Sequence, residues 1–178
     1  MLPYARIPAV AEIPNMPVNI RSFAKRDAEV CKRLYKEGPI SGKLAKNDTG
    51  LDIDDIAGAY MNSPDNHFWV AESPEGQVVG MIGVQQHQSG EGEIRRLRVR
   101  HDLRGRGVGS QLLEVAIKFC KEKQHLKVIL DTAMDPQPAL KLFDKAHFRL
   151  SRTRVLGDKT LCYFYLDLYT ADTVRKPK

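Results

Sequence analysis

The chain has 178 residues and a formal net charge of +6, and 42% of its residues are hydrophobic. These values predict a single globular domain and exclude a membrane-spanning helix, because no apolar run approaches the roughly 20 residues that such a helix needs. The three cysteines are far apart and form neither a metal-binding spacing nor a disulfide framework. We therefore predict no bound metal and a reducing, cytoplasmic compartment.

The two ends of the chain differ in composition from its centre. Residues 1–17 contain four prolines and no continuous apolar run, which predicts an N-terminal extension and not a signal peptide. Residues 171–178 are basic and predict a frayed C-terminal tail. The expected domain therefore covers residues 18–170.

The first third of this domain predicts a strand at residues 19–23 and a helix from about residue 27 to residue 37. Residues 40–50 are polar, contain two glycines and predict a mobile loop. Residues 52–61 predict a second helix with acidic residues in its first turn, where the helix dipole favours them. Acidic residues at 48–55 are suited to attracting a cationic amine, although exposed acids at a helix start explain them equally well.

A hairpin follows, with strands at residues 67–72 and 78–86, and a third antiparallel strand is expected at residues 92–100. Leu97 and Val99 share one face of this third strand, whereas Ile94 belongs to the opposite phase. Such a change of phase predicts an extra residue, a β-bulge, at Arg95–Arg96.

Glycines at 105, 107 and 109 lead from this strand into an amphipathic helix expected at residues 108–123. Glycines permit a sharp turn and leave backbone N–H groups uncovered, and a helix start adds its own free N–H groups and positive dipole. Arg104 and Arg106 raise the positive potential further. This stretch therefore predicts a site for a phosphate-bearing ligand.

The rest of the domain predicts a strand at residues 126–131 that pairs in parallel, a helix at 139–145 and a closing hairpin at 148–155 and 160–169. A dinucleotide-binding fold is an alternative, because Gly105, Gly107 and Ser110 have nearly its glycine spacing and Asp131 ends the next strand. The arginine-rich, alternating strand before the loop and the upstream hairpin argue against it. Arginines at 95–106 lack interleaved aromatic residues, so no nucleic-acid partner is expected.

In the order of its elements and in two motifs, the chain resembles the GCN5-related N-acetyltransferase (GNAT) superfamily. The first motif is Arg104-Gly105-Arg106-Gly107-Val108-Gly109. The second, looser motif comprises Ala139, Leu142, Phe143, Lys145 and Phe148. The resemblance implies an α+β fold in which a mixed, mostly antiparallel sheet is flanked by helices.

The resemblance also implies an N-acetyltransferase that moves the acetyl group of acetyl-CoA to a primary amine by direct attack in a ternary complex. The acceptor is then a small molecule or a peptide, and the protein a monomer or homodimer. The loop is implied to hold the pyrophosphate and the preceding strand to pair with the pantetheine arm. The implied acetyl-CoA-binding residues are Leu97, Arg98, Val99, Arg104, Gly105, Arg106, Gly107, Val108, Gly109 and Ser110.

Glu93 stands where many family members carry a catalytic glutamate, and it is our candidate general base. A solvent-facing strand carboxylate is the alternative interpretation, and Glu91 and His87 are nearby competitors for the role. The general acid is a departure, because Phe143 stands where the family often has a tyrosine and has no proton to donate.

Three hypotheses follow from Phe143. The thiolate leaves unprotonated, since a thiol with a pKa near 8.5 is a fair leaving group. Alternatively, Tyr163 or Tyr165 on the last strand serves as the acid, provided that strand turns the right face to the cleft. In the third hypothesis the protein is a non-catalytic acyl-CoA-binding regulator.

Overall fold

A computed structural model describes residues 15–38, 48–133, 137–157 and 159–169 of the chain. The predicted loop at 40–50 thus lies largely outside the described residues, as do most of the N-terminal extension and the whole C-terminal tail. No helix in the described ranges is long and apolar enough to cross a bilayer.

A seven-stranded sheet forms the centre of the fold, in the order β1-β2-β3-β4-β5-β7-β6. Only β4 and β5 pair in parallel, and every other neighbouring pair is antiparallel, which confirms the expected mixed sheet. The strands are β1 (Asn19–Ser22), β2 (His67–Glu72), β3 (Val78–Gln88), β4 (Glu91–Val99), β5 (Lys127–Ala133), β6 (Arg149–Leu156) and β7 (Lys159–Asp167).

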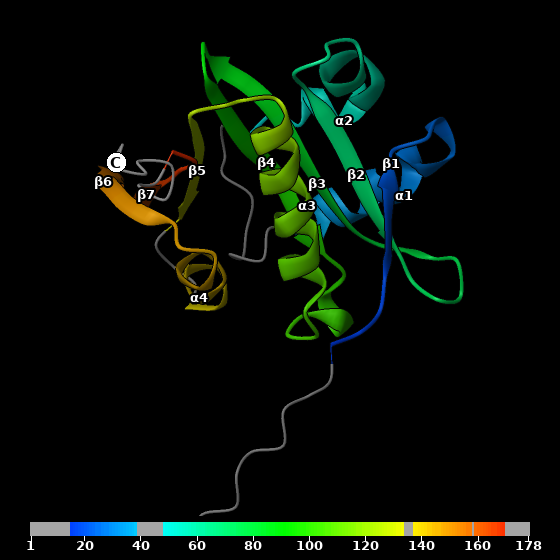
Figure 1. Ribbon diagram of the computed structural model, residues 1–178. Coiled ribbons are helices and arrows are strands. Elements are labelled where there is room, and N and C mark those ends of the chain that lie inside the picture. The colour runs from blue at the N-terminus through cyan, green and yellow to red at the C-terminus, as the bar shows by residue number, and fades with distance from the viewer. Residues whose placement is uncertain (1–14, 39–47, 134–136, 158, 170–178) are drawn as a thin grey trace, which may run out of the picture.

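Helices cover both faces of the sheet, with α3 and α4 on the side that faces the viewer in Figure 1 and α1 and α2 behind it. The α-helices are α1 (Ala28–Lys36), α2 (Leu51–Asp54), α3 (Val108–Glu122) and α4 (Gln137–Lys145). Short 3-10 helices, η1 (Lys25–Asp27) and η3 (His101–Leu103), precede α1 and the glycine loop, and η2 (Ala57–Met61) is a π-helical turn.

The single helix predicted at residues 52–61 is wrong, because α2 and η2 are separate. The Oδ1 atom of Asp55 accepts a hydrogen bond of 2.9 Å from the backbone N–H of Gly58. Asp55 itself has a non-helical backbone conformation, with φ −133° and ψ 72°. A short polar side chain that competes for a nearby backbone group interrupts a helix in this way, and sequence periodicity does not show it.

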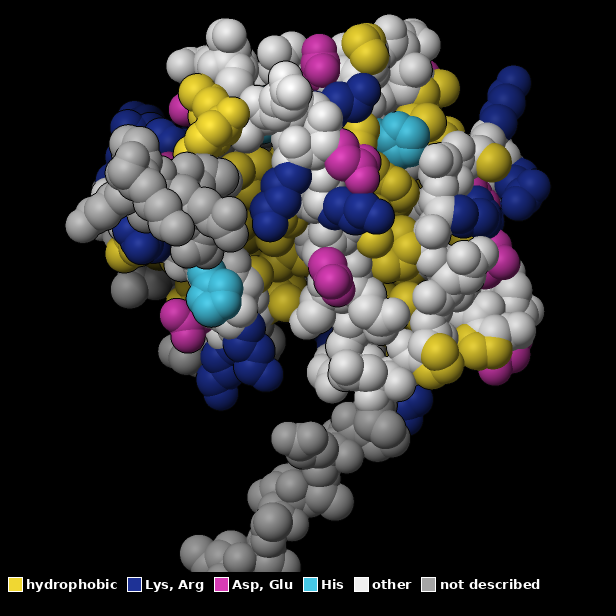
Figure 2. Space-filling model, in the orientation of Figure 1, with side chains coloured by type: hydrophobic (Ala, Val, Ile, Leu, Met, Phe, Trp, Pro, Cys, Tyr) yellow, Lys and Arg dark blue, Asp and Glu magenta, His cyan; other side chains and the backbone are white. Residues whose placement is uncertain are grey.

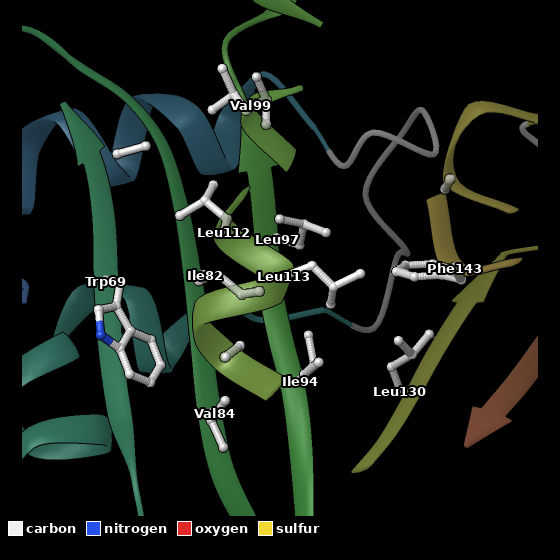
Figure 3. Packing of buried hydrophobic residues seen from close by; sticks show 14 of the residues in the cluster. Trp69, Ile82, Val84, Ile94, Leu97, Val99, Leu112, Leu113, Leu130 and Phe143 are labelled. Carbon is white, nitrogen blue, oxygen red and sulfur yellow. The ribbon is translucent and has the colours of Figure 1, made fainter. Parts of the chain in front are cut away.

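Two apolar clusters hold these layers together. The larger lies between the sheet and α3 and α4, where Leu112 and Leu113 pack against Ile94 and Leu97 of β4 (Figure 3). The smaller joins the opposite face to α1, α2 and η2. The assignment of strand residues to one cluster or the other fixes which side chains face which side of the sheet.

The predicted bulge in β4 is confirmed, shifted by one residue. Met81 pairs with Arg98 and Gly83 with Arg95, so that one residue of β3 lies opposite both Arg96 and Leu97. Arg96 has a φ of 58°, in the left-handed region that non-glycine residues seldom adopt. As a result Arg95 and Arg96 both point towards α2 and η2, as their hydrogen bonds show.

The pairing of β4 with β5 is short. It ends at Glu93 and Ile129, although β4 continues to Val99 and β5 to Ala133. The two strands therefore diverge beyond this pair, and β5 uses its other edge to pair with β7. Figure 3 shows Leu130 and Phe143 set apart from Ile94 and Leu97 of β4.

Candidate active site

The glycine loop ends where α3 begins. Gly105 and Gly107 have φ values of 75° and 78°, and the first helical hydrogen bond runs from the N–H of Gln111 to the carbonyl oxygen of Gly107, at 3.1 Å. The N–H groups of residues 108–110 precede that bond and have no acceptor within the helix. Such N–H groups, together with the helix dipole, are the features on which the predicted anion site depends.

The end of the N-terminal extension docks on this loop. The N–H of Met16 donates to the carbonyl oxygen of Arg106 at 2.9 Å, and the Nε2 atom of Gln111 donates to the carbonyl oxygen of Met16 at 3.0 Å. A Cβ atom added to Gly107 would collide with Asn15, whereas one added to Gly105 would meet open space. Gly107 thus permits close approach of another segment as well as a left-handed turn.

Two arginines hold the backbone of β4 beside the gap. The Nη1 atom of Arg98 donates to the carbonyl oxygen of Leu97 at 3.0 Å, and the Nε atom of Arg104 donates to that of Val99 at 3.1 Å. Arg98 is buried, and burial together with the nearby Arg96 lowers its pKa to about 10. Its Nε atom has no partner among the described residues.

A pocket of about 440 Å³ lies between α3 and α4 and begins at Ser110, next to the loop. Figure 2 shows hydrophobic side chains in the hollow beside α3. The residues that line the pocket are Ser110, Leu113, Glu114, Ile117, Lys118, Lys121, Leu142, Lys145 and Ala146. An apolar floor with lysines at its rim suits a flat ligand group that carries negative charge.

The opposite face of the sheet brings the predicted catalytic residues together. Val128 and Leu130 of β5 belong to the cluster below α3, and Phe164 and Leu166 of β7 pack against it. Strand alternation therefore places Glu93, Tyr163 and Tyr165 on the other face. Tyr165 pairs with Ile129, which pairs with Glu93, so one row of the sheet carries both candidates.

Neighbouring side chains restrain these three groups. The Nδ1 atom of His87 lies 3.7 Å from the Oε2 atom of Glu93. The Lys127 ammonium lies 5.7 Å from the centre of the Tyr165 ring, and the Arg152 guanidinium lies 4.4 Å from that of Tyr163. Each tyrosine ring therefore has a cation over it, on the face of the sheet that carries Glu93.

Phe143 lies in the large cluster on the α3 and α4 side, with its ring centre 5.9 Å from those of Phe148 and Phe164. His147, which follows α4, has a φ of 63°, in the left-handed region. The backbone therefore keeps the left-handed turn that suits glycine, although a side chain with a Cβ stands there.

Two of the acidic residues at 48–55 are already paired. Arg96 lies 2.6 Å from Asp48 and 2.5 Å from Asp52, and Tyr60 donates a hydrogen bond to Asp52. Burial alone would raise the pKa of both carboxyls, but the bonds to Arg96 outweigh it and hold both pKa values below the ordinary value. These carboxylates anchor α2 to the bulge and do not offer free charge to a cationic amine.

Sequence reasoning assigned no role at the gap to Arg95 and Asp131. Arg95 was named only as a bulge residue and as one of the arginines at 95–106, and Asp131 only as the residue that ends the strand after the helix. Their positions on either side of the gap depend on the register of two strands that α3 separates in the sequence. The one available signal was the change of phase before Leu97, which turns an extra arginine to this face.

Fold and loop geometry agree with the comparison to known families. The sequence profile of the acetyltransferase (GNAT) family matches residues 33–148, well over half of the chain. The chain therefore belongs to the GNAT acetyltransferase family.

Relatives of known sequence carry acetyltransferase names. The probable N-acetyltransferase camello of Xenopus tropicalis is 34% identical over 115 residues, which cover 64% of this chain and 52% of that protein. The N-acetylaspartate synthetase of Danio rerio is 33% identical over 99 residues, which cover 55% of this chain and 35% of that protein. The chain thus spans about half or less of the length of these two relatives.

Solved structures share the fold. A GNAT-family acetyltransferase of Staphylococcus aureus Mu50 superposes with a TM-score of 0.72 at 21% identity, over 85% of this chain and 99% of that one. The acetyltransferase yncA of Salmonella typhimurium, solved with its cofactor acetyl-CoA, superposes with a TM-score of 0.74 at 18% identity, over 91% and 98% of the two chains.

Proposed function

We propose that this protein is an N-acetyltransferase that moves the acetyl group of acetyl-CoA to a primary amine. The observation that carries the proposal is the divergence of β4 and β5 directly beside a glycine loop at the start of α3. Membership of the GNAT family, and the acetyl-CoA bound by yncA, support it. The relatives described above offer no support for a non-catalytic regulator.

The donor would lie along features that follow one another in the sequence. Residues 105–110 would hold the pyrophosphate through backbone N–H groups, with Arg104 and Arg106 adding positive charge. The carbonyl oxygens of Leu97 and Val99 each have a second lone pair with which to accept an N–H of the pantetheine arm. The pocket that begins at Ser110 would take the nucleotide end.

Acetyl-CoA would supply a thioester, whose carbonyl carbon is open to attack by an amine. Glu93 would remove a proton from the acceptor, directly or through water. The backbone N–H at the bulge near Leu97 would stabilise the developing oxyanion. Tyr163 or Tyr165 would return a proton to the thiolate, since both lie on the Glu93 face and Phe143 has none to give. The sheet holds both reactants together, which lowers the entropic part of the barrier.

A thiol-release assay with a panel of primary amines tests the proposal. The protein's own cysteines give little background, because all three are buried and burial raises the pKa of Cys31 and of Cys120 to about 12. We expect amine-dependent release of CoA. Binding of acetyl-CoA without release for any amine would favour the non-catalytic regulator.

A further inference from the structure

Arg95 of β4 and Asp131 of β5 border the opening between these two strands. Glu93 and Ile129 form the last pair of the parallel ladder, and two further residues along each strand bring the chain to Arg95 and Asp131. Alternation keeps these two on the face of Glu93, away from the cluster that holds Ile94 and Leu130. They therefore lie at the same level, where the strands have separated.

These opposite charges do not neutralise one another. The ion pairs within 4.0 Å among the described residues include none between Arg95 and Asp131. Arg95 is fixed instead by Gln85, whose Oε1 atom accepts a bond of 2.8 Å from its Nη1 atom and whose Nε2 atom donates to the carbonyl oxygen of Ala59 at 3.0 Å. The rest of the guanidinium keeps donors for a ligand.

Arg96, the next residue, differs from Arg95 in that carboxylates already bind it. Its guanidinium is occupied by Asp48 and Asp52, so it has little left to offer. The bulge thus turns two successive arginines to one face and uses one for structure. Of the two bulge arginines, Arg95 is the one whose guanidinium has no carboxylate within 4.0 Å among the described residues.

The carboxyl of Asp131 is placed to meet a cation. Asp131 is exposed on the open face, and Tyr163 is its partner on β7. Partial burial of the carboxyl group raises its pKa, while Arg95 and Arg96 act to lower it. Arg95 lies beyond ion-pair distance of this carboxylate. An ammonium group bound at Asp131 would supply the positive charge that Arg95 does not.

We propose that the acceptor is an α-amino acid with a free carboxylate, which binds as a zwitterion with its ammonium group on Asp131 and its carboxylate on Arg95. This inference rests on the proposed function. The bound amine nitrogen then lies above the gap, within reach of a thioester carbonyl beside the bulge. The N-terminal residue of a peptide has its α-carboxylate replaced by an amide, and a simple amine has no carboxylate at all. Either acceptor would leave Arg95 without an ionic partner.

The transfer balances with residues already named. The C–N bond forms as the C–S bond breaks, and the ammonium group loses two protons in becoming an amide nitrogen. Glu93 passes one proton to solvent. The thiolate takes up a proton from Tyr163 or Tyr165, and the second proton of the ammonium group replaces the one that the tyrosine gave. Asp131 binds and orients the ammonium group and need not change its own protonation.

Sets of three acceptors with the same side chain test the inference: the free amino acid, its α-amide and its decarboxylated amine. Acidic, aliphatic and aromatic sets are compared by CoA release and by calorimetric binding to the CoA-bound protein. We expect kcat/KM for the free amino acid to exceed that for the other two by about 10²-fold in at least one set, since either analogue leaves Arg95 without a carboxylate partner.

Variants locate the effect. Arg95→Gln should reduce that preference to about threefold or less, whereas Arg154→Gln, which removes an exposed arginine of β6, should keep it. Asp131→Asn should raise KM for the amino acid about tenfold or more, with unchanged affinity for acetyl-CoA.

The outcomes separate this inference from the proposed function. Equal turnover of all three acceptors in every set would overturn the zwitterion site and leave the acetyltransferase standing. Bound acetyl-CoA with neither release nor binding for any acceptor would overturn both. The comparison of acceptors uses the unaltered protein, so its result does not depend on whether the variants fold.

Discussion

The loop before α3 and the face that carries Glu93 are the two halves of the proposed site, and they are built differently. The loop uses backbone N–H groups of consecutive residues, held by glycines at positive φ. The face uses side chains of β3, β4, β5 and β7, which meet only through the sheet. A backbone site tolerates varied side chains but not a misplaced Cβ, whereas a side-chain site depends on the identity and ionisation of each group.

The largest expected effect concerns the side-chain half. Glu93→Gln should lower kcat by about 10²–10⁴-fold if Glu93 is the base, because the amide cannot accept the proton. Acetyl-CoA affinity, measured by calorimetry, should stay the same. Glu91→Gln is the matched comparison, since Glu91 lies two residues earlier on the same strand with its carboxylate 3.9 Å from Lys127. An unchanged rate for Glu93→Gln would make Glu93 a surface carboxylate, and a larger loss at Glu91 would move the base there.

The ion pairs behind that face should matter for stability. Arg96→Gln leaves Asp48 and Asp52 without their cation, and their low exposure makes the loss about 2–4 kcal/mol in the free energy of unfolding. Urea denaturation measures it. Arg100→Gln is the control, because the Arg100–Asp102 pair is far more exposed and should contribute less than about 1 kcal/mol. Equal losses would show that the Arg96 pairs do not anchor α2.

Replacing a loop glycine by alanine, which adds a Cβ atom, tests the backbone half of the site. Gly107→Ala should weaken acetyl-CoA binding by about tenfold, because the added atom is strained at positive φ and also displaces Asn15. Gly105→Ala has the same strain without the collision and should have the smaller effect. Calorimetric dissociation constants decide between them. The double variant Asn15→Gly with Gly107→Ala should regain part of the affinity, and no recovery would show that the collision is unimportant.

Acid should remove the support of the Arg96 ion pairs. Because the folded-state pKa values of Asp48 and Asp52 are lowered, their contribution is present above the unfolded pKa of about 3.9 and is lost as the pH falls through the folded values. The difference in unfolding free energy between the unaltered protein and Arg96→Gln should therefore shrink below about pH 4. Denaturation at pH 7, 5 and 3 measures this, and a difference independent of pH would argue against ionic anchoring.

The smallest effect concerns the end of α4, on the side of the pocket. His147→Gly should raise the unfolding free energy by about 1 kcal/mol, because glycine adopts a φ of 63° without a Cβ penalty. His147→Ala keeps the Cβ and should not gain. Thermal unfolding of the three proteins tests this, and an equal gain for alanine would assign the effect to the imidazole.

Local signals accounted for most of the fold. The α3 helix, predicted at 108–123, spans Val108–Glu122, and the bulge followed from the phase of Ile94 against Leu97. The division of the predicted helix at 52–61 was missed, since a hydrogen bond from Gly58 to Asp55 leaves no trace in hydrophobic periodicity. The pairing of the acids at 48 and 52 with Arg96 was missed because it joins residues more than forty positions apart.

The sequence by itself determined the features of the proposed donor half, because the glycines and the helix that follows them are contiguous and act through the backbone. Tertiary structure alone decided the arrangement of the proposed acceptor half. Strand register and the early end of the β4–β5 ladder place Arg95 and Asp131 on the two strands that border the opening, and alternation turns Tyr163 and Tyr165 to the same face as Glu93. Register depends on packing across the whole sheet, so no single segment of the chain contains it.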